Sequence, residues 1–379
     1  MLTRHLVLLV AALAVAMALS SCEAAKPVPD RKRLFIIGQD LGAVRAYYAS
    51  ECCATPDGNM MYLNFYGLAN EDWGYGGLGM DLGGNPIEHE QDWGAGPTSA
   101  WKSATEFEGG IAIGLSMTES DAADGLARIA AGEFDRNISQ LAAFLTKINK
   151  PVYLRIGYEF DGGWNAGYEN ADNYIAAWRH IVDGLREAGV SNVEDVWQSA
   201  AFPLDILNDG GYTDIRQWYP GDEYVDWMGF SLFLTPDESP AVSVDFQPPT
   251  GRELIGKVQE LARERGKPVF SGEASPQGYD LPRGTNANIA PTWDGPQAEG
   301  VRVVSDEDIW NEWFAPVFRL MEEHRDVIYA LAYINVNWDS QDMWDAPYES
   351  GYWGDSRLQV NPYVAERFNQ AIERWRSMD

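Results

Sequence analysis

Short apolar runs alternate with amphipathic stretches along most of this chain. Each run holds five to nine residues rich in Val, Ile, Leu and aromatic side chains, as expected for a strand that is buried on both faces. We therefore predict eight strands, at Leu34–Gly38, Met61–Tyr66, Gly110–Met117, Pro151–Gly157, Val193–Ser199, Val225–Leu232, Pro268–Gly272 and Ile328–Val336.

The stretches between these runs carry the spacing of helices. The clearest has apolar residues at i, i+3, i+4, i+7, i+8 and i+11 from Tyr174 to Leu185, and either Asn170 or Asp172 could cap it. A second helix is expected from Asp306 to Glu323, and a last one from Tyr363 to Trp375.

Strands that alternate with helices favour a single α/β domain, a (β/α)₈ barrel with its helices outside a closed parallel sheet. The competing architecture is an open doubly wound sheet, which usually carries a glycine-rich phosphate turn after its first strand. Here the first strand is followed by Gly38-Gln39-Asp40-Leu41-Gly42, which lacks that pattern. We therefore expect one barrel domain over residues 34–379.

Three connections that follow predicted strands are unusually long, namely Gly67–Ser99, Pro276–Ser305 and Asn337–Gln359. In a barrel of this kind such loops lie at the face where active sites form. The first loop carries Trp73 and Trp93, and the third begins close to Trp338. Long loops that bear aromatic side chains favour a ligand-binding role.

The first 21 residues predict a signal peptide, because the apolar run Leu6–Leu19 is too short to span a bilayer comfortably. The run ends at Leu19-Ser20-Ser21-Cys22, which resembles a bacterial lipobox and implies cleavage before Cys22 and a lipid on its sulfur. Glu23 in place of Asp implies an outer-membrane address. The alternative is an ordinary signal peptide with an incidental cysteine. Residues 22–33 are expected to form a flexible tether.

The chain is strongly acidic, with 57 Asp and Glu residues against 28 Lys and Arg residues. Polyanions would be repelled, so we expect no nucleic-acid partner. The four histidines show no metal-ligand spacing, and we expect neither a metal nor a cofactor. Besides Cys22, the cysteines are the neighbours Cys52 and Cys53. We expect two buried thiols there, with a strained vicinal disulfide as the alternative.

Two glutamates, Glu159 and Glu273, stand at the ends of apolar runs. Side chains alternate along a strand, so Arg155 shares one side with Glu159 and, if that side faces the barrel axis, can hold a nearby carboxylate ionised. The two glutamates then converge at the barrel mouth. Retaining cleavage of a glycosidic bond needs one neutral carboxyl and one carboxylate, roughly 5–5.5 Å apart. The alternative for either glutamate is a buried structural anion paired with an arginine.

Several segments together resemble glycoside hydrolase family 26 over most of the chain from Leu34 onward, namely Leu154–Asn165, Tyr174–Val182, Val196–Gln198, Val225–Gly229 and Lys267–Glu273. The resemblance implies a retaining barrel with its acid/base on the fourth strand and its nucleophile on the seventh. Glu159 is then the acid/base and Glu273 the nucleophile. Arg155 and Trp164 match family positions, and Trp338 matches the tryptophan under the −1 sugar. We expect further substrate contacts from Tyr158, Asp161, Asn165, Phe233, Trp73 and Trp93.

Three positions depart from the mannan-cleaving members of that family. Tyr158 stands where they have His, Ala274 where they have Phe, and Phe233 where a Tyr would bond the nucleophile. The sequence Tyr158–Gly162 looks more like the branch that hydrolyses β-1,3-xylan. Because Phe233 has no hydroxyl, the resemblance leaves open how Glu273 is held.

The expected function is a secreted, lipid-anchored and monomeric retaining endo-β-glycanase, acting on a plant or algal cell-wall polysaccharide. The substrate that we expect is β-1,3-xylan. An endo-β-1,4-mannanase or another β-glucanase on the same scaffold is the alternative within the family. A glycan-binding lipoprotein without catalytic activity is the alternative from another class, because a fold alone does not establish activity.

Overall fold

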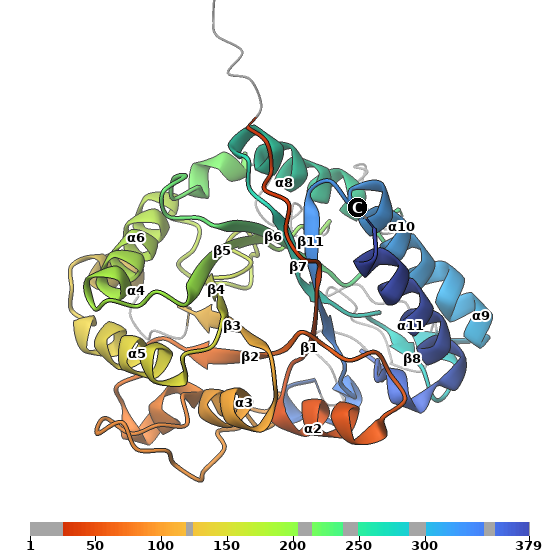
Figure 1. The fold of residues 1–379 in the computed structure, drawn as a ribbon, viewed down its shortest axis with the longest axis horizontal. Coiled ribbons are helices and arrows are strands. Elements are labelled where there is room, and N and C mark those ends of the chain that lie inside the picture. Colours follow the sequence, from red (N-terminus) through yellow and green to blue (C-terminus); the bar gives the residue numbers. More distant parts are fainter. Residues whose placement is uncertain are drawn as a thin grey trace, which may run out of the picture.

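The computed structural model of the chain describes residues 26–118, 124–203, 214–237, 249–287, 301–344 and 353–378. Within them, eight strands close into a parallel barrel in the order β1-β11-β7-β6-β5-β4-β3-β2. Helices surround this barrel (Figure 1), so the predicted (β/α)₈ fold is confirmed. The expected signal peptide and Cys22 lie outside the described residues. The barrel strands are β1 (Leu34–Gly38), β2 (Gly58–Asn64), β3 (Gly110–Ser116), β4 (Val152–Ile156), β5 (Val193–Ser199), β6 (Trp227–Leu232), β7 (Val269–Ala274) and β11 (Ile328–Ile334).

Helices connect the strands on the outside of the barrel. They are α2 (Leu41–Ser50), α3 (Ala100–Glu106), α4 (Gly125–Ala130), α5 (Asp135–Ile148), α6 (Ala171–Glu187), α8 (Gly251–Arg265), α9 (Asp306–Ile309), α10 (Ala315–Glu323) and α11 (Pro362–Arg376). A π-helical turn, η3 (Trp310–Phe314), joins α9 to α10, so the helix expected from Asp306 is interrupted there. Short 3₁₀ turns are η1 (Glu71–Gly77), η2 (Ile215–Trp218), η4 (Trp338–Ser340), η5 (Asp342–Trp344) and η6 (Leu358–Val360).

Helix α6 shows how directly the hydrophobic pattern determines an element. Its buried residues are the six of the predicted stripe, Tyr174, Ala177, Trp178, Ile181, Val182 and Leu185. The Asn170 side chain accepts a hydrogen bond from the Asn173 backbone N–H and so caps the helix. Asp172 lies in the first turn instead.

Strand ends differ from the predicted ones where pairing extends beyond the apolar run. β2 begins at Gly58 because Gly58 and Asn59 pair with both β1 and β3. β7 extends to Ala274, so Glu273 lies inside the strand rather than just after it. The long loop after β7 contains a small antiparallel sheet of β8 (Tyr279–Asp280), β9 (Thr285–Ala287) and β10 (Val301–Val303).

Two hydrophobic clusters form the core. The larger joins residues of strands and helices and therefore fills the layer between the sheet and its helices. The smaller consists mainly of strand residues that point to the barrel axis, including Ile36, Met60, Ala112, Val196 and Phe270. Tyr153 of β4 packs against this inner cluster, so by alternation Arg155 also points inward.

The described part of the expected tether, residues 26–33, runs across the N-terminal ends of the barrel strands (Figure 1). Arg31 forms an ion pair with Glu194 of β5. The Arg31 guanidinium also lies 4.9 Å from the ring centroid of Trp227, at the start of β6. This part of the chain is therefore tied to the barrel face opposite the strand ends that carry the two glutamates.

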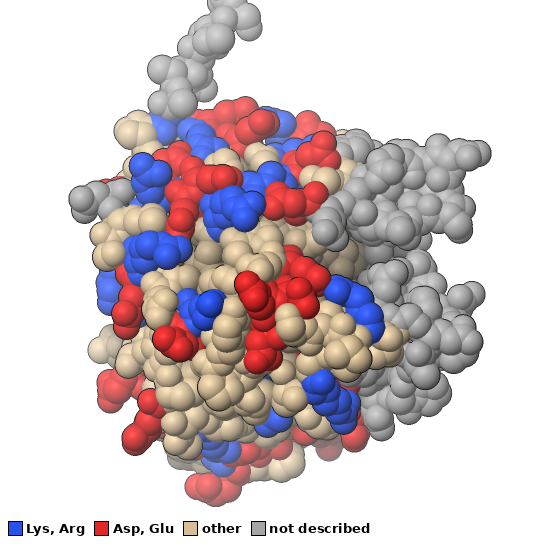
Figure 2. Space-filling view, turned by 90° about the vertical axis from the view of Figure 1, so that its right-hand side faces the viewer, with Lys and Arg blue, Asp and Glu red and all other residues tan. Residues whose placement is uncertain are grey.

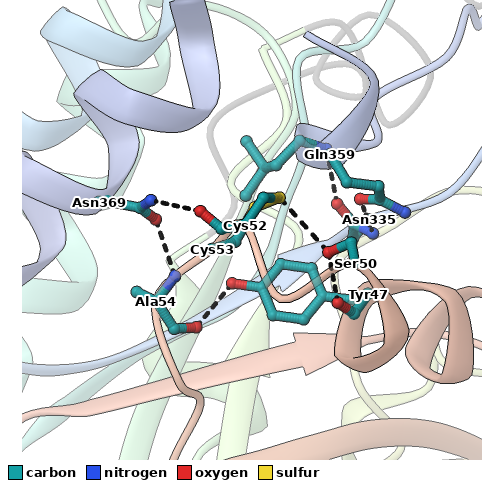
Figure 3. Close-up of a disulfide and its surroundings, with 9 residues drawn as sticks. Tyr47, Ser50, Cys52, Cys53, Ala54, Asn335, Gln359 and Asn369 are labelled. Atoms are coloured by element: carbon teal, nitrogen blue, oxygen red, sulfur yellow. Dashed lines mark hydrogen bonds between the residues drawn. A yellow bond between two sulfur atoms is a disulfide. The ribbon is translucent and has the colours of Figure 1, made fainter. Parts of the chain in front are cut away.

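Cys52 and Cys53 form a vicinal disulfide, so the expectation of two buried thiols is wrong. Cys52 is exposed and Cys53 only partly buried, because the turn from α2 to β2 carries them on the surface. The Asn369 side chain of α11 donates to the Cys52 carbonyl at 2.9 Å and accepts from the Ala54 N–H at 2.8 Å (Figure 3). These two bonds fix the turn against α11.

Acidic and basic side chains are interspersed on the face that carries α9, α10 and α11 (Figure 2). None of the helices in the described part of the chain is both long and apolar enough to cross a membrane.

Candidate active site

Glu159 lies on a turn that follows β4. The strand ends at Ile156, and Gly157 (φ 49°) and Glu159 (φ 55°) both take left-handed backbone conformations. Such a φ is uncommon for a residue other than glycine. The Glu159 carbonyl is held by the Asn165 side-chain amide at 2.7 Å and by the Gly162 N–H at 2.9 Å. These two hydrogen bonds fix the turn, and it aims the Glu159 side chain into the barrel mouth.

The Glu159 carboxyl is buried, at 7% exposure, and each of its oxygens accepts a hydrogen bond. Trp164 Nε1 donates to Oε2 at 2.9 Å, and Ser231 Oγ donates to Oε1 at 2.6 Å. Burial, together with the negative charge of Glu273, raises the pKa of Glu159 to about 8, although these two hydrogen bonds oppose the rise. Glu159 is therefore protonated at neutral pH and can donate a proton.

Glu273 of β7 is equally buried, at 5% exposure, but it has a cation beside it. Arg155 Nη1 donates to Glu273 Oε1 at 2.5 Å, and Gln198 Nε2 lies 3.5 Å from the same oxygen. Burial by itself lowers the pKa of Arg155, but Tyr62 and Glu273 raise it to above its ordinary value, so the guanidinium stays charged. Arg155 thus supplies the partner that Phe233 cannot, which answers how Glu273 is held.

Two tyrosine rings enclose the Arg155 guanidinium. The Tyr62 ring centroid lies 5.1 Å from it and the Tyr158 centroid 5.2 Å. Tyr62 comes from β2, and Gly114 of β3 leaves the space for both groups. A Cβ on Gly114 would lie 2.8 Å from Arg155 Nη2 and 2.5 Å from the Tyr62 ring. Sequence reasoning missed Tyr62, although alternation along β2 places it on the inward side with Met60.

A chain of hydrogen bonds links the two carboxyl groups through residues that sequence reasoning also missed. Arg155 Nη1 donates to Gln198 Oε1 at 3.0 Å, and Gln198 Nε2 donates to Ser231 Oγ at 2.9 Å. Ser231 in turn donates to Glu159. Gln198 is two residues after the inward-facing Val196 on β5, so a polar side chain at an inward position was the available signal.

Aromatic side chains lie on both sides of the carboxyl pair. Trp164 is 50% exposed and meets Phe202 edge to face at 5.6 Å, so an open indole face stands beside Glu159. Trp338 is 2% exposed, and its Nε1 donates at 3.2 Å to Ser275, two residues after Glu273. Trp338 packs in a cluster with Phe233, Trp344 and Trp353, with ring centroids 5.1–6.3 Å apart.

Of the other residues predicted to contact substrate, Asp161 and Asn165 form hydrogen bonds within the protein, and Trp73 and Trp93 lie in a loop. Both oxygens of Asp161 accept hydrogen bonds at 2.6 Å from the end of β5, one from Ser199 Oγ and one from the Ala200 N–H. The Asn165 amide holds the backbone of the Glu159 turn. Trp73 and Trp93 lie in the loop after β2 and are 38% and 40% exposed. The structure thus joins Arg155, Tyr158, Trp164, Glu159 and Glu273 directly in one site.

Known proteins resemble this chain over most of its length. The family model Glycosyl hydrolase family 26 matches residues 106–267. A β-1,3-xylanase (TXYA) of a Vibrio species is 33% identical over 349 residues, which cover 92% of this chain and 66% of that protein. The chain belongs to glycoside hydrolase family 26. A β-1,3-xylanase of an Alcaligenes species is 32% identical over 92% of this family 26 chain and 65% of that protein. The chain therefore spans about two thirds of the length of these relatives.

Solved structures of family 26 share the barrel. A β-mannanase from Bacteroides ovatus has a TM-score of 0.51 and 16% identity, over 89% of this chain and 88% of that one. The catalytic domain of an endo-β-1,4-mannanase from Bacillus sp. JAMB-750 has a TM-score of 0.51 and 17% identity, over 92% of this chain and 90% of that one. At these identities the likeness shows the fold, which confirms the predicted architecture.

Proposed function

We propose that this family 26 chain is a retaining endo-β-1,3-xylanase. The observation that carries the proposal is the split environment of two buried carboxyl groups. Glu159 is kept protonated by burial and by the charge of Glu273, whereas Glu273 is paired with a buried arginine. Retaining cleavage requires this division between an acid and a carboxylate. A glycan-binding protein without catalytic activity would have no need of it.

The reaction proceeds in two displacements. Glu159 gives its proton to the leaving glycosidic oxygen while Glu273 attacks the anomeric carbon and forms a glycosyl-enzyme ester. The ester removes the negative charge that helps to raise the pKa of Glu159, so this pKa falls and Glu159 becomes the carboxylate that the next step needs. Glu159 then takes a proton from water, and the water oxygen displaces Glu273 from the sugar.

The choice of β-1,3-xylan rests on the two β-1,3-xylanases that resemble most of the chain. Tyr158, which stands beside Arg155 where mannan-cleaving members are expected to have His, supports the same choice. The mannanases among the solved structures make β-1,4-mannan the second candidate. The open face of Trp164 offers an apolar surface on which a sugar ring can stack, on the side of the leaving group.

Incubation with β-1,3-xylan, β-1,4-mannan, β-1,4-xylan and mixed-linkage glucan tests the proposal. Rapid release of short oligosaccharides from β-1,3-xylan, with the β-anomer formed first by proton NMR, is expected. Glu159→Ala and Glu273→Ala should each lower the rate by orders of magnitude. Faster release from mannan would replace the substrate, and near-wild-type activity of either alanine variant would overturn the catalytic roles.

We further propose that the chain is exported as a monomer and anchored to the outer membrane through a lipid on Cys22. The lipobox-like Leu19–Cys22 supports this address, and residues 22–33 would connect the lipid to the barrel. In a Gram-negative host, the protein should fractionate with the outer membrane, and Cys22→Ser should release it. Membrane attachment that survives Cys22→Ser would exclude the lipid anchor.

A further inference from the structure

We propose that Ser231 is a positioning residue that, with Gln198, carries the influence of the Arg155 cation to Glu159 and so serves the second displacement, in which Glu159 is the base. The inference rests on the proposed function and assigns Ser231 to the second of its two steps. Ser231 and Gln198 are 3% and 0% exposed, so solvent does not compete for their hydrogen bonds.

The Arg155 guanidinium determines the direction of every hydrogen bond in the series Arg155–Gln198–Ser231–Glu159. The Arg155 guanidinium has donors only, so the Gln198 atom that faces it at 3.0 Å is the amide oxygen. The amide nitrogen then faces Ser231, and Ser231 Oγ must accept from it at 2.9 Å. The single hydroxyl proton of Ser231 is left for Glu159 Oε1, at 2.6 Å.

The fold holds these hydrogen-bonded side chains in place. Gln198 packs closely between Gly272 and Gly229. A Cβ added to Gly272 would lie 2.2 Å from Gln198 Oε1, and a Cβ added to Gly229 would lie 3.2 Å from Gln198 Cβ. The pairing of β6 with β7 shifts register after Phe230, so that Ser231 stands opposite Glu273. A local irregularity of this kind re-aims side chains. The extra residue, Gly272, lies on β7, so the shift turns Glu273 toward the barrel axis, where Ser231 already points by alternation from Trp227.

A donor that cannot reverse favours the ionised form of its acceptor. The charged and titratable groups that influence Glu159 are Glu273, Arg155 and Tyr62. Glu273 opposes ionisation of Glu159, and that opposition disappears in the glycosyl-enzyme. During the second displacement, water gives a proton to Glu159, its oxygen bonds to the anomeric carbon, and the electron pair of the broken ester returns to Glu273. The hydrogen bond from Ser231 favours the ionised form of Glu159, which accepts that proton.

The first test needs no substrate. The side-chain carboxyl of Glu159 is titrated by ¹³C NMR in glutamate-labelled protein, with Glu159→Gln used to assign the signal. In Ser231→Ala the pKa of Glu159 should rise by about one unit, because a hydrogen bond to a charged group is lost. Ser231→Thr keeps the hydroxyl and should restore the wild-type titration.

Ser271→Ala is the matched control. Ser271 is a buried serine on β7 whose hydroxyl makes no hydrogen bond among the described residues, so its removal should leave the titration of Glu159 unchanged. An unchanged titration in Ser231→Ala, or an equal shift in Ser271→Ala, would overturn the proposal. The control also separates the role of Ser231 from a general effect of removing a buried hydroxyl.

The second test separates the two displacements. With 2,4-dinitrophenyl β-1,3-xylobioside the leaving group needs no proton, so kcat reports the second displacement. Ser231→Ala should move the acid limb of that kcat to higher pH by about one unit, so that kcat falls by up to about ten-fold at pH values below the pKa of Glu159 in the glycosyl-enzyme, since one unit of pKa is a ten-fold change in the ionised fraction. KM should fall with it as the glycosyl-enzyme accumulates. On the polysaccharide, the alkaline limb of kcat/KM should move to higher pH.

A loss of kcat on the activated substrate without a fall in KM would contradict the role in the second displacement. Inactivity of the wild-type protein toward every glycan would contradict the proposed function instead. The NMR titration would still decide whether Ser231 acts on Glu159.

Discussion

Replacing Glu159 by Gln should make the protein more stable at neutral and alkaline pH. The folded pKa of Glu159 is about 8, against an ordinary value of 4.5. Between those two values the folded state binds more protons than the unfolded chain. The stability contributed by this group is therefore complete below about pH 4.5 and is lost as the pH rises toward 8. The side-chain amide of the Glu159→Gln variant would carry no charge at any of these pH values, so the variant would not incur that loss.

The expected size follows from the shift. Each unit of pKa difference corresponds to about 1.4 kcal/mol, so the wild type loses about 3 kcal/mol between pH 4.5 and 7 that the variant keeps. Near pH 8 the loss reaches about 4 kcal/mol, and it levels off at about 5 kcal/mol at higher pH. The amide oxygen of the variant can still accept the bond from Trp164 Nε1, but its NH2 group faces Ser231 Oγ and the bond from that hydroxyl is lost. This loss does not depend on pH, so the change of the stability difference with pH is the quantity that reports on the pKa of Glu159. Other buried acids, such as Asp40 and Asp195, titrate in both proteins and cancel in the comparison.

Urea unfolding of both proteins at several pH values between 4.5 and 8, followed by tryptophan fluorescence, measures this difference. The gap between the two stabilities should widen steadily as the pH rises. Parallel stability curves would refute the assignment of Glu159 as a buried acid that is protonated at neutral pH. Glu273→Gln is the contrasting variant, because it leaves the Arg155 cation buried without its carboxylate. It should destabilise the protein at pH 7 by about 3–5 kcal/mol.

Three further substitutions test other parts of the structure. Trp164→Phe keeps an aromatic ring but removes the Nε1 donor to Glu159, so kcat/KM should fall about ten-fold and its alkaline limb should move to higher pH; an unchanged pH profile would argue against the bond. Arg155→Met leaves Glu273 buried without a cation, so hydrolysis should fall at least about 100-fold and the free energy of unfolding by about 3–5 kcal/mol; normal turnover would refute the pairing. Replacing both Cys52 and Cys53 by Ser should leave kcat/KM unchanged, because the turn lies at the N-terminal ends of the strands. The same double variant should change stability by less than about 1 kcal/mol, because the disulfide closes the smallest possible loop; a loss of activity would place the turn in contact with the site.

Much of the fold could be predicted because it depends on local periodicity. The stripe from Tyr174 to Leu185 becomes the buried face of α6, and the runs at β1 and β5 match the observed strands residue for residue. The ends of β2 and β7 could not be placed as well. Gly58 and Asn59 carry no strand signal of their own and are extended only because neighbouring strands pair with them.

Part of the candidate site could likewise be predicted from the sequence and part could not. Glu159 and Glu273 could be found because each lies at the end of an apolar run, and Arg155 because alternation along β4 places it on the inward side with Tyr153. Alternation from the inward-facing Phe270 would turn Glu273 outward, and only the register shift between β6 and β7 turns it inward.

Ser231 and Gln198 also stand at inward positions, on the same sides of their strands as Trp227 and Val196, but an inward position alone does not show which carboxyl group each one reaches. Asp161 is expected to contact substrate, and a sequence cannot show that its two oxygens also accept hydrogen bonds from the end of β5. The vicinal disulfide was only the alternative to two buried thiols, because the exposure of a turn depends on what packs against it.

The sequence by itself determined the barrel, the two glutamates and the inward-facing arginine, because period and strand position are properties of short segments. Only the tertiary structure decided that Arg155 pairs with Glu273 and that a hydroxyl from β6 reaches Glu159. These contacts join β4, β5, β6 and β7, which are brought together by the closure of the barrel. Closure also removes both carboxyl groups from water and places the Arg155 cation beside Glu273 alone, which gives the two glutamates different environments.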